Sequence, residues 1–190
     1  MKLRSIYLLI SLLGFCSCIY DDQNAYELKV GDYLPEFSIE MNDGTRVSSS
    51  DLKETVSCVV FFHTECPDCQ KTLPQVQKLY DRFSSEVRFV LISREESDAS
   101  IARFWEENGL TMPYSAQSDR NVYSLFAQSR IPRVYICSKG GKIEAVFTDE
   151  PDTPSYDDMA EVLSDELIYN KLLINHRHLL SLWVVDVLSP

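Results

Sequence analysis

Two cysteines stand three positions apart, in the order Cys66-Pro67-Asp68-Cys69, shortly after an apolar stretch that reads VVFF. A Cys-x-x-Cys pair can exchange a disulfide with another molecule, form an inert disulfide, or supply half of a metal site. Zinc would need two further ligands at suitable spacing, whereas His176 and His178 lie far along the chain and no second Cys-x-x-Cys is present. Redox exchange is therefore the leading chemical interpretation.

The surrounding pattern assigns different tasks to the two thiols. Proline suits the first helical position, so the sequence predicts a helix that starts at Pro67, with Cys66 as its N-cap. A helix N-terminus carries unpaired N–H groups and about half a positive charge, and both favour thiolate at Cys66. Cys69 lies one turn further along. We therefore expect Cys66 to be the attacking nucleophile and Cys69 to resolve the mixed disulfide.

Charged and titratable residues near the two cysteines influence whether the protein reduces or oxidises its substrate and which side chain transfers a proton. The Asp68 carboxylate disfavours a nearby thiolate, which indicates a reductant or isomerase, because strong oxidants depend on a very stable thiolate. His63 and Glu65 are the candidates for proton transfer, although His63 also suits a strand end with no catalytic part.

Periodicity predicts the elements that position these residues. Phe37, Ile39 and Met41 alternate with polar residues before Asn42-Asp43-Gly44, which is typical of a hairpin, and Ser50 or Asp51 is expected to cap a short helix. Further strands are expected at 56–62, 87–92, 112–116, 134–137 and 142–147, and helices at 67–83, 99–108, 122–128 and 156–178. The order predicts an α/β fold with a mixed sheet, whose chemistry gathers at the carboxyl ends of strands.

This arrangement resembles the thioredoxin superfamily, and most closely its TlpA-type envelope thiol–disulfide oxidoreductases. The shared features are the VVFF strand leading into Cys66, Pro74 within the following helix, Ile131-Pro132 before a later strand, and a GGKI turn. The resemblance implies a thioredoxin-like fold with an N-terminal β-hairpin and a βα insertion. It also implies that Pro132 is a cis-proline and that no cofactor is bound beyond the redox-active disulfide Cys66–Cys69. Substrate would be bound by Pro67, Asp68 and Ile131.

Some features depart from that resemblance. Val60 occupies the position at which thioredoxins carry a buried acid, and Arg133 follows the proline where Thr is common. We expect Arg133 to be solvated or ion-paired. Two alternatives stay open: copper delivery through Cys66, Cys69 and His63, and a peroxiredoxin-like peroxidase, although His63 stands where such enzymes usually carry Thr or Ser. A binding domain without redox activity is a third.

Two cysteines lie away from this pair. Cys58 and Cys137 each sit within an apolar strand, where a free cysteine behaves as a small hydrophobe. They are expected to be buried thiols, with a second disulfide as the alternative.

The N-terminus has the pattern of an export signal. Lys2 and Arg4 precede a short apolar run, so residues 1–17 are expected to be a lipoprotein-type signal peptide, with lipidation at Cys18. Lipidation at Cys16, ordinary cleavage and an uncleaved segment are the alternatives. Residues 18–30 would be a tether, 31–178 the thioredoxin-like domain, and 179–190 an apolar tail, too short to span a membrane, that packs on the core.

The composition and the predicted export limit the classes of partner that we expect. The formal net charge of −11 over 190 residues argues against nucleic acid. The expected partners are protein thiols and disulfides of the envelope, an upstream electron donor of unknown identity, and a membrane reached through the lipid anchor. The expected location is the periplasm or outer membrane of a Gram-negative bacterium. Asp21 and Asp22 suit either display on the outer surface or a solvated tether.

Overall fold

A five-stranded mixed sheet forms the centre of the molecule. The computed structural model describes residues 26–188, and side chains as far as residue 174. The strand order is β5-β4-β3-β6-β7, in which β3, β4 and β5 are parallel and β6 and β7 run antiparallel to their neighbours. The strands are β3 (Val56–Phe62), β4 (Val87–Ser93), β5 (Tyr114–Ser115), β6 (Arg133–Cys137) and β7 (Ile143–Phe147). The predicted mixed α/β sheet is confirmed.

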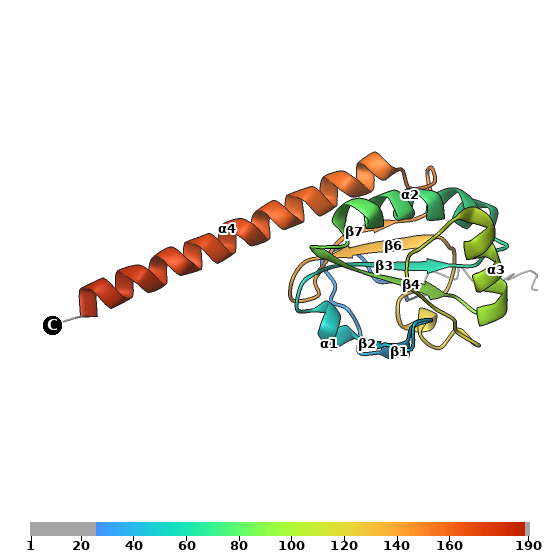
Figure 1. Cartoon of the computed structure of the whole chain (residues 1–190), viewed down its shortest axis with the longest axis horizontal. Coiled ribbons are helices and arrows are strands. Elements are labelled where there is room, and N and C mark those ends of the chain that lie inside the picture. Colours follow the sequence, from blue (N-terminus) through green and yellow to red (C-terminus); the bar gives the residue numbers. More distant parts are fainter. Residues whose placement is uncertain (1–25, 189–190) are drawn as a thin grey trace, which may run out of the picture.

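Helices and a small hairpin cover the sheet. Figure 1 shows α2 and α4 over one face and the β1–β2 hairpin with α1 over the other. The helices are α1 (Ser49–Leu52), α2 (Pro67–Phe83), α3 (Asp98–Asn108), the 3-10 helix η1 (Tyr123–Leu125) and α4 (Tyr156–Leu188), and the hairpin strands are β1 (Ser38–Glu40) and β2 (Arg46–Ser48). The predicted hairpin, the start of α2 at Pro67, and Pro74 inside that helix are all confirmed.

The core forms on both faces of β3 because every residue of that strand is buried. Successive side chains point to opposite faces, so Phe61 and Phe62 join different aromatic clusters. Phe61 contacts Tyr123 and Phe126 near the hairpin, with ring centroids 5.4 Å and 4.8 Å away. Phe62 instead packs on Trp105 of α3 at 5.0 Å. Packing on both faces fixes β3 and therefore the segment that follows it.

Three local predictions need correction. The cap of α1 is Ser48, whose side chain accepts from the Asp51 amide, whereas Ser50 or Asp51 was expected in that place. Asp51 instead returns its carboxylate to the Ser48 amide, which completes a capping box. The strand expected at 112–116 is only two residues long, and the helix expected at 122–128 is a single 3-10 turn.

The last helix is longer than predicted. It continues to Leu188, whereas an end near residue 178 was expected, because no glycine or proline interrupts 156–188. Its first turns are anchored by buried Met159, Ala160 and Leu163. Its C-terminal half extends beyond the edge of the sheet (Figure 1). No helix within residues 26–188 has the length and apolar character needed to cross a membrane.

The N-terminal boundary also differs from the predicted one. Residues 26–30 belong to the predicted tether, yet Leu28 is buried and its amide donates to the Phe126 carbonyl at 2.8 Å. The packed part of the chain therefore begins before residue 31. The predicted signal peptide, the lipidation at Cys18 and its alternative at Cys16 lie outside the described residues, as does the end of the apolar tail.

Candidate functional site

Three chain segments meet at one end of the sheet. β3 and β4 are parallel, so their carboxyl ends lie at the same edge, and the antiparallel strand β6 begins there. Residues 63–66 follow β3, residues 94–96 follow β4, and residues 130–132 precede β6. The Cys-x-x-Cys pair and the Ile131-Pro132 loop, separated by 65 positions in sequence, therefore face each other.

The two cysteines occupy the positions that the sequence predicts. Cys66 is the N-cap of α2, and its sulfur accepts a hydrogen bond from the Cys69 amide at 3.4 Å. The Cys66 thiol in turn donates toward the Ile131 carbonyl at 3.5 Å. Cys66 is partly exposed in a cleft, whereas Cys69 is completely buried. An incoming disulfide can reach only the first sulfur.

Burial makes the Cys69 thiol a weaker acid than an ordinary cysteine. Removal from water raises the pKa of the Cys69 thiol well above its ordinary value, and the hydrogen bond with Cys66 raises it further. The His63 backbone amide and the Arg94 guanidinium oppose this rise in the pKa of Cys69. Cys69 is therefore protonated at neutral pH in the reduced protein, and it must lose that proton before it can attack.

The loop opposite Cys66 is held by several side chains. The Ile131–Pro132 peptide bond is cis, as expected. The Tyr123 hydroxyl donates to the carbonyls of Ser129 and Arg130 at 2.6 Å and 2.7 Å. Arg133 also donates to these two carbonyls, through Nε.

Arg133 was expected to be solvated or ion-paired. The side chain is only 3% exposed and is ion-paired with Glu27 at 2.6 Å, so the expected ion pair is confirmed and solvation is not. Burial beneath the loop lets this residue tie the N-terminal segment to the site.

His63 lies in the cleft beside a buried acid that sequence reasoning missed. The Glu96 side chain is 5% exposed, and its carboxylate lies 3.8 Å from Nδ1 of His63. Glu96 also accepts from the backbone amide of Thr64 at 2.9 Å and from the Thr64 hydroxyl. A buried carboxylate beside His63 is thus supplied by the loop after β4, whereas position 60 carries valine.

A sequence signal for Glu96 was available. An acid that follows a buried parallel strand lies at the carboxyl edge of the sheet, where the site was expected. The same reasoning applies to Arg94, which directly follows β4 and lines the cleft.

The other predicted site residues lie around the mouth of the cleft. Pro67 is exposed, and Asp68 is 39% exposed and bonded to Lys71 at 2.9 Å. This pairing partly neutralises Asp68, which weakens the predicted repulsion of the Cys66 thiolate. Glu65 is exposed, and its amide donates to Nδ1 of His63 at 3.2 Å.

The remaining strand cysteines are separate buried thiols. Cys58 and Cys137 are fully buried and free. Ser57, not Cys58, pairs with Cys137 across β3 and β6, so the expected buried free thiols are confirmed and the alternative second disulfide is not formed. Burial raises the pKa of Cys58 and raises that of Cys137 to about 12. Within the described part of the chain, no group of three or more His, Cys, Asp or Glu side chains is arranged to hold a metal ion.

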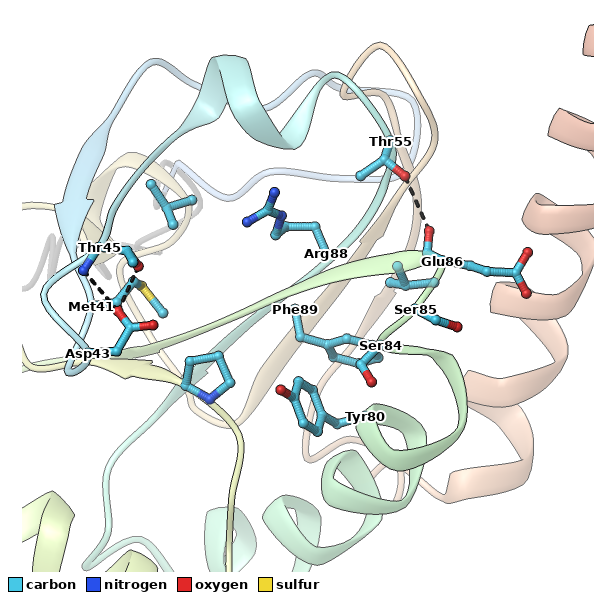
Figure 2. A pocket seen from close by; sticks show the side chains of 13 residues that line it. Met41, Asp43, Thr45, Thr55, Tyr80, Ser84, Ser85, Glu86, Arg88 and Phe89 are labelled. Carbon is cyan, nitrogen blue, oxygen red and sulfur yellow. Dashed lines mark hydrogen bonds between the residues drawn. The ribbon is translucent and has the colours of Figure 1, made fainter.

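A second hollow lies near the opposite end of β4. Tyr80, Ser84 and Phe89 are among its lining residues, and Figure 2 shows the Arg88 side chain within it. None of the predicted site residues lines this hollow.

The fold and the site together define a thioredoxin-like protein. The structure superposes on a candidate protein disulfide isomerase from Bacteroides thetaiotaomicron with a TM-score of 0.69 and 21% identity, covering 75% of this chain and 92% of that one. It superposes on a thiol:disulfide interchange protein from Chlorobium tepidum with a TM-score of 0.62 and 22% identity, covering 74% and 99%.

Sequence comparison identifies the family. The profile of the AhpC/TSA family matches residues 30–146, and the chain belongs to that family. Over 145 residues it is 28% identical to the thiol-disulfide oxidoreductase ResA of Bacillus subtilis, covering 73% of this chain and 81% of the relative.

Proposed function

We propose that this protein is a thiol–disulfide oxidoreductase that acts on protein substrates through Cys66 and Cys69. One observation carries the proposal: an accessible sulfur caps a helix, and a second, buried sulfur lies one turn behind it. Relatives that share most of the chain are named as thiol-disulfide oxidoreductases, which supports the same activity.

The reaction requires two exchanges. The Cys66 thiolate attacks a substrate disulfide, forms a mixed disulfide and releases the first substrate thiolate. Cys69 then loses its proton, attacks the Cys66 sulfur and releases the second substrate thiolate. Two electrons have passed to the substrate, and the protein holds the Cys66–Cys69 disulfide. An external dithiol donor must reduce that disulfide before the next cycle, and no bound cofactor takes part.

The substrate segment would lie between α2 and the cis-proline loop. Ile131 faces Cys66, and exposed Pro67 lines the same cleft, with partly exposed Asp68 next to it on α2. An extended segment paired with the Ile131 backbone would present its disulfide to Cys66. We assign the protein to reduction or isomerisation, because Asp68 lies in the first turn of α2, where a carboxylate opposes a stable thiolate even when Lys71 partly neutralises it.

Trapping tests this order of events. In Cys69→Ser the resolving sulfur is absent, so mixed disulfides through Cys66 should accumulate and can be isolated with their partners. Cys66→Ser is the matched control and should capture nothing, while both variants should lose insulin reduction. Capture by Cys66→Ser but not by Cys69→Ser would reverse the assigned roles. If Cys69→Ser captures no partner and the wild type does not reduce insulin, the proposed activity is ruled out.

The same preparation separates the alternative activities. A peroxidase would consume hydrogen peroxide with Cys66 as its only essential thiol. A copper carrier would bind copper stoichiometrically, lose it in His63→Ala, and leave insulin unreduced. A binding domain without redox activity would do neither.

We further propose export and attachment to the cell envelope through Cys18. Lys2, Arg4 and the apolar run that follows them support a signal of the lipoprotein type. Incorporation of a labelled fatty acid into the full chain, lost in Cys18→Ala but kept in Cys16→Ala, would support lipidation at residue 18. Export without any label would overturn it.

A further inference from the structure

The cleft that exposes Cys66 has two arginines in its wall. It is lined by His63, Glu65, Cys66, Pro67, Arg94, Arg130 and Ile131. An arginine carries five N–H donors and no acceptor. The acceptors around its guanidinium therefore show whether other residues of the protein already use these donors. Arg130 is ion-paired with Glu150 and lies 3.6 Å from Asp149, and it is therefore occupied.

Among the described residues, Arg94 has only one distant acidic neighbour and no close partner like the Glu150 carboxylate on Arg130. Its Nε is buried without a hydrogen-bond partner, and none of the side chains described through residue 174 accepts a hydrogen bond from its guanidinium. The nearest carboxylate, that of Glu95, lies 3.7 Å away, beyond hydrogen-bond distance, and is itself held by Arg120. The side chain is 24% exposed, so a group in the cleft can reach it.

We propose that Arg94 binds a carboxylate of the substrate, and that the protein therefore prefers disulfides with an acidic group next to the reactive cysteine. This inference rests on the proposed function. A guanidinium binds a carboxylate through two parallel hydrogen bonds, which provides direction as well as charge attraction. Such a ligand would supply acceptors for the terminal Nη donors, which have no side-chain acceptor within hydrogen-bond distance among the residues described through 174.

The negative charges in and near the cleft do not cancel the preference for an acidic substrate. Glu65 is exposed, so water and salt screen its repulsion of an anion. Glu96 is occupied by Thr64 and lies beside His63. The carboxylate could come from an acidic side chain or from the C-terminus of the substrate, because the chemistry at Arg94 is the same for both.

Matched peptides test the preference and identify its source. Each peptide contains one cysteine in a mixed disulfide with a neutral chromogenic thiol. The residue before the cysteine is Glu, Gln or Lys, with an amidated C-terminus, and a fourth peptide ends in a free carboxylate directly after the cysteine. The measured quantity is kcat/KM for each acidic peptide divided by that for the Gln peptide.

In the wild type this ratio should be about tenfold or more, the usual size of a hydrogen bond to a charged group. In Arg94→Gln it should fall to about one, and in Arg94→Lys it should be intermediate, because charge is kept and the paired geometry is lost. Using a ratio removes any uniform effect of Arg94 on Cys69. Arg88→Gln is the control, because it removes the same charge from the opposite end of β4 (Figure 2) and should keep the wild-type ratio.

The outcomes separate the two proposals. Turnover of all peptides with equal kcat/KM, or a preference that persists in Arg94→Gln, overturns the role of Arg94 alone. A preference for the Glu peptide assigns an acidic side chain, and a preference for the free carboxylate assigns a C-terminus. Absence of turnover with every peptide removes the oxidoreductase function, and with it this inference.

Discussion

The two active-site sulfurs differ because of their positions on one helical turn. Cys66 caps α2 and opens to the cleft, where an amide hydrogen bond is available to its thiolate. Cys69 lies inside the protein, where burial raises its pKa. The exposed sulfur can start a reaction, whereas the buried one can act only on a partner already joined to Cys66. Their order of use therefore follows from solvent access.

Deprotonation of Cys69 should limit the second exchange at neutral pH, and we expect His63, whose side chain lines the cleft with Cys66, to assist it. We predict that His63→Ala slows substrate release from the mixed disulfide by about tenfold or more at pH 7, the lower end of general-base effects. The loss should shrink toward pH 9, where hydroxide can take the proton. Single-turnover release of a labelled peptide measures this rate.

The alanine variant keeps the His63 backbone amide, which opposes the raised pKa of Cys69, and so it removes only the imidazole. Glu65→Gln is the control, since Glu65 is exposed and adjacent to Cys66. Equal release rates in the wild type and His63→Ala at pH 7 would exclude a part for the side chain. Glu96→Gln should slow release less than His63→Ala if Glu96 acts through His63.

At the scale of elements, the cis-proline loop depends on an N-terminal segment over one hundred residues away. Glu27 accepts from Arg133 and from Ser129, while Arg133 holds the carbonyls of Ser129 and Arg130. These contacts join residues 26–30 to the wall of the site. The segment that connects the domain to its predicted anchor is therefore also part of the active-site framework.

Removing Glu27 should destabilise the fold more than removing its partner. Glu27→Gln leaves the Arg133 charge buried with its ion pair broken, which should cost about 2–3 kcal/mol, whereas Arg133→Met removes the charge itself and should cost less. The free energy of unfolding in urea measures both changes.

An exposed ion pair provides the comparison. Glu36 pairs with Lys53 at 2.5 Å but is 74% exposed, so Glu36→Gln should change the unfolding midpoint far less than Glu27→Gln. Similar midpoints for these two variants would show that burial of Arg133 does not control the stability of the loop. Slower insulin reduction by Glu27→Gln would also indicate that the loop has moved relative to Cys66.

At the scale of the whole molecule, the sheet encloses titratable groups that stay protonated. Burial raises the pKa of Cys58 beyond the usual range and raises those of Cys137 and Tyr135 to about 12. In the unfolded chain a cysteine titrates near a pKa of about 8.5. Above that pH the unfolded state loses protons that the native state keeps, so stability is full below about pH 8.5 and falls as the pH rises.

We predict that the unfolding free energy of the reduced protein falls between pH 8.5 and 10 by about 1.4 kcal/mol per pH unit for each buried thiol. Tyrosines contribute little in this window, because their unfolded pKa is about 10. Urea unfolding in the presence of a reductant, at half-unit steps of pH, gives the slope.

Removing a strand thiol should flatten that slope. Cys58→Ala will lower stability at every pH because it leaves a cavity, but the dependence on pH should weaken by one thiol's share. An unchanged slope in both Cys58→Ala and Cys137→Ala would mean that these thiols do not keep their protons in the native state.

Much of this fold could be predicted because local patterns encode local structure. Pro67 and the three-and-four spacing behind it predicted α2, and the unbroken apolar run predicted a central strand at β3. The lack of a helix breaker before residue 189 was equally visible, and weighing it would have extended α4. The short β5 could not be predicted, since its length depends on the neighbour that pairs with it.

The candidate site, like the fold, could be predicted only in part from the sequence. The amino-acid sequence by itself determined the cysteine pair, the helix that one sulfur caps, and the proline loop that faces it, because each depends on neighbouring residues or on a resemblance carried by short motifs. Only the tertiary structure decided that Glu96 lies beside His63, that Glu27 neutralises Arg133, and that Arg94 lines the cleft with its nearest carboxylate 3.7 Å away. Those contacts depend on which strands become neighbours, and a hydrogen bond between residues distant in sequence exists only once the sheet has brought them together.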